Sequence, residues 1–263
     1  MGFLLDLHPA ISFVIVAVVC VGLSWLGLML VRKRFESEQL RENHDVAGMV
    51  FNSFGLIYAV LIAFVVFAVW TSYDTAKQNA EMEANKLSDL FLDAQAFPDT
   101  MKKEIRFAIR DYTKAVVEQE WDVMGKRQRQ RTDVIQNLRK VWEAYLQVDV
   151  KSINNPSMYD ESLRQLNYMS EYRRLRWFAS RSGTPAVIWI VLIVGGVTNV
   201  VYTFFFGTRR TKAQFVMTGV IALINSMVLF LIYILDNPFT GYNGISDDAF
   251  RSVLGMFIRM TGG

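Results

Sequence analysis

The chain has 263 residues, of which 52% are hydrophobic and only 20% are charged. This composition is too apolar for a water-soluble protein of this length, so we expect part of the chain to face lipid. The formal net charge of +3 is small and scattered, which argues against a nucleic-acid partner. The single cysteine excludes a disulfide framework.

The first apolar stretch covers residues 11–31 and is long enough to cross a bilayer of about 30 Å as a helix. It ends in Arg32, Lys33 and Arg34, and no basic residue precedes it. A secretory signal has a basic start and a small-residue cleavage site instead. We therefore interpret this stretch as a retained span.

A second apolar stretch covers residues 49–70, and no proline interrupts the chain from there to Phe97. Beyond Trp70 the apolar residues narrow to one stripe with the helical spacings of three, four and seven. The stripe consists of Ala76, Ala80, Leu87, Leu90, Phe91 and Ala94. We predict that the second span continues unbroken into a water-exposed domain, as a helix about 75 Å long at 1.5 Å per residue.

One face of the second span carries small and uncharged side chains at spacings of three or four. Its members are Asn52, Leu56, Ala59, Ala63, Val66 and Trp70. One hypothesis makes this face a pore wall, with Asn52 at the cytoplasmic mouth and an apolar narrow section that gates by dewetting. The alternative is that small residues let a neighbouring helix approach closely, as in any bundle.

Residues 73–183 form a charged segment without a further span. Pro98, Gly125 and Pro156 interrupt it, and between these breaks apolar residues recur at helical spacing. No alternating strand pattern, glycine-rich phosphate loop or fixed repeat occurs in it. The segment is therefore predicted to be an all-helical soluble domain.

The third and fourth spans are predicted at residues 185–206 and 215–235, and none of the four spans contains Asp, Glu, Lys or Arg. Ion-coupled transporters place ionisable groups there, so this class is disfavoured. Small and polar residues in the third span indicate either close packing with an interhelical hydrogen bond or a pore lining. These residues are Gly195, Gly196, Thr198, Asn199, Tyr202 and Thr203. In the fourth span, Asn225 and Ser226 are expected to bond a neighbouring helix.

A turn follows the fourth span and contains Asp236, Pro238 and Phe239. Asp236 either caps this turn or faces a vestibule, where it would attract cations. Ser246 is predicted to be the N-cap of a final amphipathic helix. That helix lies at the membrane interface or docks on the soluble domain.

The predicted fold is an all-α membrane protein with four transmembrane helices in a two-plus-two arrangement and an inserted helical soluble domain. The expected segments are residues 9–72 with spans one and two, 73–183 as the soluble domain, 184–236 with spans three and four, and 237–263 as the C-terminal turn and helix.

Basic residues near the ends of spans set the orientation, because positive short loops stay in the cytoplasm. The two short loops contain Arg32, Lys33, Arg34, Arg41, Arg209, Arg210 and Lys212. Four arginines before the third span argue the other way, but they belong to a long connection. We predict that both termini and the soluble domain are extracytoplasmic.

The sequence contains little that could support catalysis or metal binding. Its only histidines, His8 and His44, fall on opposite sides of the membrane in the predicted topology, and a structural zinc site needs about four Cys or His ligands. No catalytic spacing such as G-x-S-x-G or H-E-x-x-H occurs. We therefore predict no enzyme activity, no cofactor and no metal.

Four short motifs suggest a family. They are W-x-x-Y-x-x-A at Trp70, Tyr73 and Ala76, E-A-x-x-L at Glu83, Ala84 and Leu87, E-W at Glu120 and Trp121, and D-x-P-F-x-G at Asp236, Pro238, Phe239 and Gly241. Because these motifs occur in this order on a two-plus-two span layout, the chain resembles the bacterial and plant membrane proteins of unknown function called bestrophin-like.

The resemblance implies a homo-oligomer in a bacterial inner (plasma) membrane that conducts inorganic ions, because bestrophins are anion channels whose pore is lined by the second span. In this chain the pore residues would be those of the Asn52 to Trp70 face. The chain has no acidic cluster like the calcium clasp of bestrophins, so anion selectivity and calcium gating do not follow. The competing hypothesis is a non-conducting membrane sensor or scaffold that binds a partner through its soluble domain.

Overall fold

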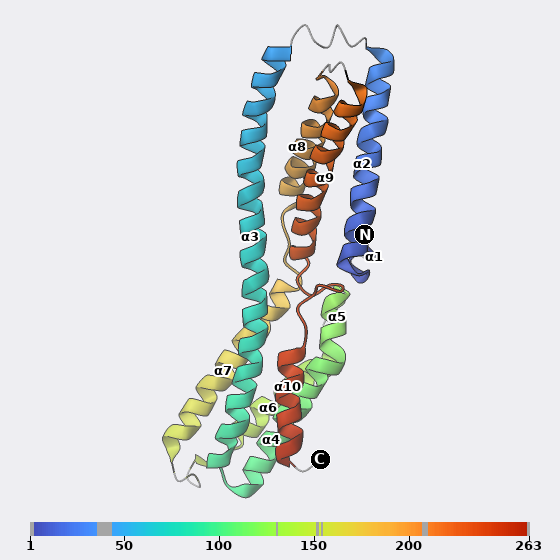
Figure 1. The fold of residues 1–263 in the computed structure, drawn as a ribbon. Helices are drawn as coiled ribbons and strands as arrows, with labels where there is room; N and C mark the ends of the chain where they lie inside the picture. The colour runs from blue at the N-terminus through green and yellow to red at the C-terminus, as the bar shows by residue number, and fades with distance from the viewer. Residues whose placement is uncertain are drawn as a thin grey trace. The chain divides into compact units, whose positions relative to one another are not determined.

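The structure, a computed structural model, describes residues 3–35, 44–129, 131–150, 153, 155–206 and 210–261. All regular elements in these ranges are helices (Figure 1). Contacts divide the chain into two compact units: unit 1 comprises residues 1–72 and 183–236, and unit 2 comprises residues 73–182 and 237–263. Residues 237–263, which the sequence sets apart as a separate segment, thus pack within unit 2.

Within the described ranges, four helices are long and apolar enough to cross a membrane. They are α2 (Pro9–Arg34), the first part of α3 (His44–Asp93), α8 (Ala186–Phe204) and α9 (Thr211–Leu235). A short helix, α1 (Phe3–Asp6), precedes them. The predicted fold class, an all-helical protein with four spans in a two-plus-two order, is confirmed.

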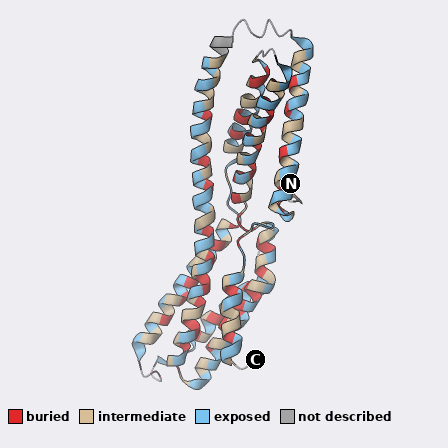
Figure 2. Ribbon diagram, in the orientation of Figure 1, coloured by how far each residue is buried: buried red, intermediate tan, exposed pale blue. Residues whose placement is uncertain are grey.

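In unit 1, α2 packs on α9 and α8, and α8 packs on α9. Only 17–39% of each apolar segment is buried within the chain, and pale blue faces run along α2 and α3 (Figure 2). Large apolar side chains such as Val18 and Leu30 are about two-thirds exposed, at 66% and 68%. Such surfaces suit a hydrocarbon surrounding and would be unfavourable in water.

Unit 2 is a helical domain built around the C-terminal part of α3. Its other elements are η2 (Ala94–Ala96), α4 (Asp99–Ala115), the π-helical turn η3 (Val116–Glu120), α5 (Trp121–Gly125), α6 (Thr132–Leu146), α7 (Pro156–Ala179) and α10 (Asp248–Thr261). The predicted stripe from Ala76 to Ala94 is buried in its core.

Helix α3 runs without a break from His44 to Asp93, as the absence of proline predicted. A helix of 50 residues is about 75 Å long at 1.5 Å per residue. The helix belongs to unit 1 up to Ser72 and to unit 2 from Tyr73 onward. The same helix therefore contributes residues to both units.

The final helix α10 buries Phe250 and Phe257 in the core of unit 2, and the Phe257 ring stacks on Phe91 with centroids 4.1 Å apart. Its N-cap is Asp247, whose backbone carbonyl accepts from the Arg251 amide. The expectation that Ser246 caps this helix is wrong, because the Ser246 hydroxyl donates instead to the Asp248 carboxylate.

Candidate functional site

Most of the candidate pore face of α3 is left uncovered by the rest of the chain. Asn52, Ala59 and Ala63 are exposed, Leu56 and Trp70 are 69% and 58% exposed, and Val66 is half-buried. The alanines therefore do not serve close packing inside this chain. Whatever covers them lies outside the chain: water, lipid or another subunit.

A different face of α3 packs on α8. The ring of Tyr58 is 5% exposed, and its hydroxyl donates to the backbone carbonyl of Leu192 at 2.7 Å. A Cβ on Gly195 would lie 2.3 Å from the Tyr58 ring, and one on Gly196 would lie 2.9 Å from its hydroxyl. The two glycines are therefore needed for the approach of α8 to α3, which is the packing role considered for them.

Polar side chains connect the C-terminal ends of α2 and α8 to the N-terminal part of α9. The hydroxyls of Thr203 and Thr218 lie 2.9 Å apart, and Gln214 donates to the Thr203 carbonyl at 3.0 Å. The guanidinium of Arg32 donates to the Gln214 side-chain oxygen and to the Thr211 hydroxyl. Thr198 and Asn199 are half-buried on α8, and the Tyr202 ring packs on Phe51 with centroids 5.9 Å apart.

The expectation that Asn225 and Ser226 bond a neighbouring helix is wrong. The Ser226 hydroxyl donates to Leu223 of its own helix at 2.8 Å, because a serine inside a helix reaches the carbonyls of the preceding turn. The side-chain nitrogen of Asn225 is buried and has no hydrogen-bond partner among the residues that the structure describes.

Asp236 links the end of α9 to the start of α8. Its Oδ1 accepts from the backbone amide and the hydroxyl of Thr184, at 2.6 and 2.7 Å. Its Oδ2 accepts from the Trp189 indole at 3.4 Å. The carboxylate thus satisfies donors just before the first turn of α8, where a negative charge is also favoured by the helix dipole.

Pro238 and Phe239 are buried in unit 2. The Phe239 ring meets the Trp121 ring edge-on with centroids 5.8 Å apart, and the Pro238 carbonyl accepts from the Ile245 amide at 2.7 Å. Gly241 has a positive φ of 76°, which explains why the motif ends in glycine. These residues form a tight, packed turn.

A cluster of four charged side chains lies in the core of unit 2; we call Glu83, Glu120, Arg173 and Arg176 the ion-pair cluster. Arg176 donates to Glu83 through Nε at 2.7 Å and through Nη2 at 3.1 Å, and to Glu120 through Nη2 at 2.8 Å. Arg173 donates to Glu120 at 2.6 Å. The side chains of Glu83, Glu120 and Arg176 are at most 1% exposed.

Aromatic groups and a π-helical turn surround the cluster. The Tyr112 hydroxyl donates to Glu83 at 2.7 Å, and the Arg176 guanidinium lies 5.2 Å from the Trp121 ring centre and 5.3 Å from that of Phe250. Glu120 ends the π turn, whose Val116 carbonyl accepts from the Trp121 amide. Isolated π turns are frequent at functional sites.

Burial and charge together set the protonation of the cluster. Burial alone would lower the pKa of Arg176, but the carboxylates of Glu83 and Glu120 outweigh this effect and raise it. Burial, followed by the Glu83 carboxylate, raises the pKa of the Tyr112 hydroxyl well above 10. Arg176 therefore stays charged and Tyr112 stays neutral at physiological pH.

Residues from all four sequence motifs lie in unit 2. Glu83 and Glu120 belong to the cluster, Trp121 packs on Phe239, and the Trp121 indole donates to the Ile245 carbonyl at 3.0 Å. Tyr73 donates to the Asn243 carbonyl at 3.2 Å. Among the described residues, no group of three or more His, Cys, Asp or Glu side chains could hold a metal ion.

The sequence model of the bestrophin-like domain matches residues 18–250. No curated protein matches the chain in a sequence comparison. A point-mutated bacterial bestrophin homologue from Klebsiella pneumoniae has a similar structure, with a TM-score of 0.74 at 11% identity, covering 96% of this chain and 100% of that one.

A bacterial bestrophin homologue from Klebsiella pneumoniae solved by Zn-SAD phasing has a TM-score of 0.71 at 12% identity, covering 95% of this chain and 98% of that one. At identities this low, the structural similarity establishes a shared fold and nothing more. The sequence match over residues 18–250 establishes membership of the family. The chain belongs to the bestrophin-like domain family.

Proposed function

We propose that this protein is the subunit of a homo-oligomeric ion channel, in which α3 lines the pore and the helical unit 2 gates or caps it. The observation that carries the proposal is the uncovered face of α3 from Asn52 to Trp70, in a chain whose family is named after the bestrophin channels. Permeant ions and the lipid bilayer are then its partners, and no catalytic step is needed.

The chemistry of this face suits a gated pore. Ala59 and Ala63 are small enough to leave an axial path, and Leu56 and Val66 on either side of them are apolar. A narrow apolar section excludes water when closed and conducts when it widens slightly. Asn52 and Trp70 provide polar or amphipathic side chains at the two ends.

The proposed pore needs several subunits, because one subunit alone leaves this face of α3 open and encloses no path. A closed ring of identical chains turns the same face of every α3 toward the symmetry axis. The face that contains Tyr58 is already occupied by α8, so the subunit keeps its own fold while the exposed face serves assembly and conduction.

The continuity of α3 suggests how unit 2 could act as the gate. The ion-pair cluster holds the α3 residue Glu83 to Arg176 of α7 and, through Arg176, to Glu120. A rearrangement that shifts α3 in unit 2 is transmitted along the helix, since no proline separates Glu83 from Ala63.

We further propose that both termini and unit 2 are extracytoplasmic. The arginines that argue against this orientation include Arg173 and Arg176, which pair with buried carboxylates and contribute little free positive charge. Of the loop residues that favour it, Arg41 and Arg209 lie outside the described residues.

Orientation is tested by labelling cysteines introduced into a Cys20→Ser background. An impermeant thiol reagent applied to intact cells should label Gln136→Cys, on an exposed position of α6, but not Ser37→Cys, which lies outside the described residues. Permeabilised cells, in which both should react, are the control. Labelling of Ser37→Cys alone in intact cells would reverse the orientation.

The channel itself is tested with full-length protein purified in mild detergent and reconstituted in liposomes. We expect a discrete oligomer by mass measurement and ion flux that scales with the protein-to-lipid ratio. A monomer confirmed by crosslinking in membranes would contradict the assembly. An oligomer without flux for any small inorganic anion or cation would instead favour the non-conducting sensor or scaffold.

A further inference from the structure

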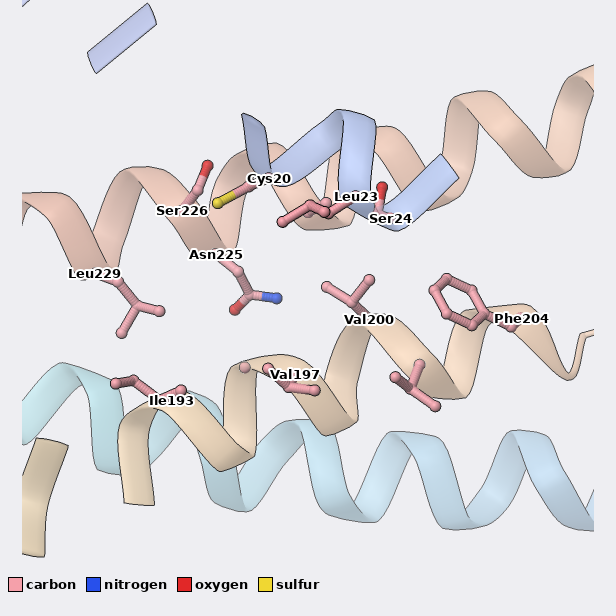
Figure 3. A pocket seen from close by; sticks show the side chains of 13 residues that line it. Cys20, Leu23, Ser24, Ile193, Val197, Val200, Phe204, Asn225, Ser226 and Leu229 are labelled. Atoms are coloured by element: carbon pink, nitrogen blue, oxygen red, sulfur yellow. The ribbon is translucent and has the colours of Figure 1, made fainter. Parts of the chain in front are cut away.

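A cavity of about 370 Å³ lies between α2, α8 and α9 in unit 1. Figure 3 shows Cys20 and Ser24 from α2, Val197 and Val200 from α8, and Asn225 from α9 around this space. Its volume falls in the range of about 300–1,000 Å³ typical of small-molecule sites. Most of its wall is aliphatic, so it would hold an apolar body better than water.

Asn225 supplies an amide donor in this wall that makes no hydrogen bond to the described residues. Asn225 is only 9% exposed, its side-chain nitrogen has no partner in the described part of the chain, and Figure 3 shows the amide directed toward α8. The hydroxyls of Ser24 and Ser226 already donate to carbonyls of their own helices, at 2.7 and 2.8 Å. A buried amide donor without a partner is unfavourable, so an acceptor placed here would be held.

The position of the cavity indicates where its ligand comes from. Asn225 lies near the middle of α9, and apolar residues of the wall such as Leu23, Ile193 and Val197 are 50–62% exposed on the outer surface of the unit. The cavity therefore opens toward the hydrocarbon layer. The ester groups of phospholipids lie at the membrane interface and do not reach this depth.

We propose that this cavity binds a neutral, largely apolar molecule that dissolves in the bilayer and carries a carbonyl oxygen, such as a ketone or quinone. The carbonyl accepts from the Asn225 side-chain nitrogen, and the apolar body fills the space between Leu23 and Val200. This binding does not depend on ion conduction, and the site is separate from the candidate pore face of α3.

The test uses benzophenone, an apolar ketone that inserts into nearby C–H bonds on illumination. Full-length protein in liposomes is illuminated with increasing benzophenone, and the modified residues are mapped by mass spectrometry. We expect saturable labelling of the cavity wall. Excess cyclohexanone should compete with it, whereas methylenecyclohexane, which has the same skeleton without the carbonyl oxygen, should not.

Two variants and a matched control make the test specific. Asn225→Leu keeps the shape and removes the donor, and should reduce cavity labelling by about fivefold or more. Ala222→Phe fills the cavity while leaving Asn225 in place, and should abolish the labelling. Ser226→Ala removes another polar group from the same wall, one whose donor is already used, and should leave the labelling unchanged.

Non-saturable labelling spread over the exposed residues of all four membrane helices would overturn the proposal. Labelling of Asn225→Leu at the wild-type level would also overturn it. Competition by both cyclohexanone and its hydrocarbon analogue would show a void that fills without a hydrogen bond, which contradicts the role of Asn225.

Discussion

Replacing Arg176 by methionine should destabilise unit 2 strongly. The fully buried guanidinium makes three hydrogen bonds to carboxylates, two to Glu83 and one to Glu120. In Arg176→Met, Glu83 keeps only the Tyr112 hydroxyl and Glu120 keeps Arg173. Removing one partner of a buried ion pair costs about 3–5 kcal/mol, because the remaining charge is no longer compensated.

The expected loss is large enough to measure by thermal unfolding. At roughly 4 °C per kcal/mol for a domain of this size, the unfolding temperature should fall by about 12–20 °C. Tryptophan fluorescence of the full-length protein in mild detergent measures this unfolding, since the Trp121 ring centre lies 5.2 Å from the Arg176 guanidinium. Adding Glu83→Gln to Arg176→Met removes the orphaned charge and should recover part of the loss.

Arg174→Met is the matched control, because Arg174 is exposed on the same helix. Its effect should stay within about 0.5 kcal/mol. The electrostatic reasoning fails if Arg176→Met unfolds within a few degrees of this control. It also fails if the double variant with Glu83→Gln is less stable than Arg176→Met alone.

Two further predictions concern packing and pH. Gly195→Ala places a Cβ 2.3 Å from the buried Tyr58 ring and should cost about 1–3 kcal/mol of stability in a thermal unfolding assay. Gly22→Ala is the control, because its new Cβ would meet no atom of the described residues within 4 Å and the change should be neutral or stabilising. Equal effects of the two variants would disprove the contact between Gly195 and Tyr58. Because burial raises the folded-state pKa of Tyr112 above 10, the stability linked to its proton is complete below about pH 10 and is lost as the pH rises beyond it. The unfolding temperature of the wild type should therefore fall more steeply above about pH 10 than that of Tyr112→Phe, and identical slopes would refute this.

The helices could be predicted from the sequence because their signals are local. Apolar runs longer than a bilayer is thick predicted the four spans, and the absence of proline predicted the unbroken α3. The stripe from Ala76 to Ala94 predicted the core of unit 2, since helical periodicity determines which side chains face inward.

The ion-pair cluster was missed because it joins residues far apart in the chain. Glu83 and Glu120 were noted only as parts of motifs, and Arg173 and Arg176 only as charges near a span. A signal was present: Glu83 falls on the buried stripe of α3, and Arg173 and Arg176 continue the buried face of α7 at spacings of three and four. Charges on an apolar face at helical spacing indicate buried pairing.

Asn225 was assigned wrongly for a related reason. A polar residue in a span is expected to bond a neighbouring helix, and that expectation holds for Thr203 and Thr218. At Asn225 the opposing wall across the cavity is aliphatic. Sequence spacing cannot reveal what stands opposite a side chain, since that depends on how the helices cross.

Single-channel recording in planar bilayers tests the channel most directly, by comparing the wild type with Ala63→Lys and Ala68→Lys. Both alanines are exposed on α3, and the second lies five residues on, roughly 140° around the helix at 3.6 residues per turn. We predict that the wild type conducts and that Ala63→Lys has a changed conductance or reversal potential. Ala68→Lys should conduct like the wild type. If Ala63 packs against another helix instead, its lysine would be buried at a cost of roughly 2.5–3.5 kcal/mol and assembly should fail. A well-assembled Ala63→Lys channel with unchanged currents, or no currents from the assembled wild type, would contradict a pore lined by this face of α3.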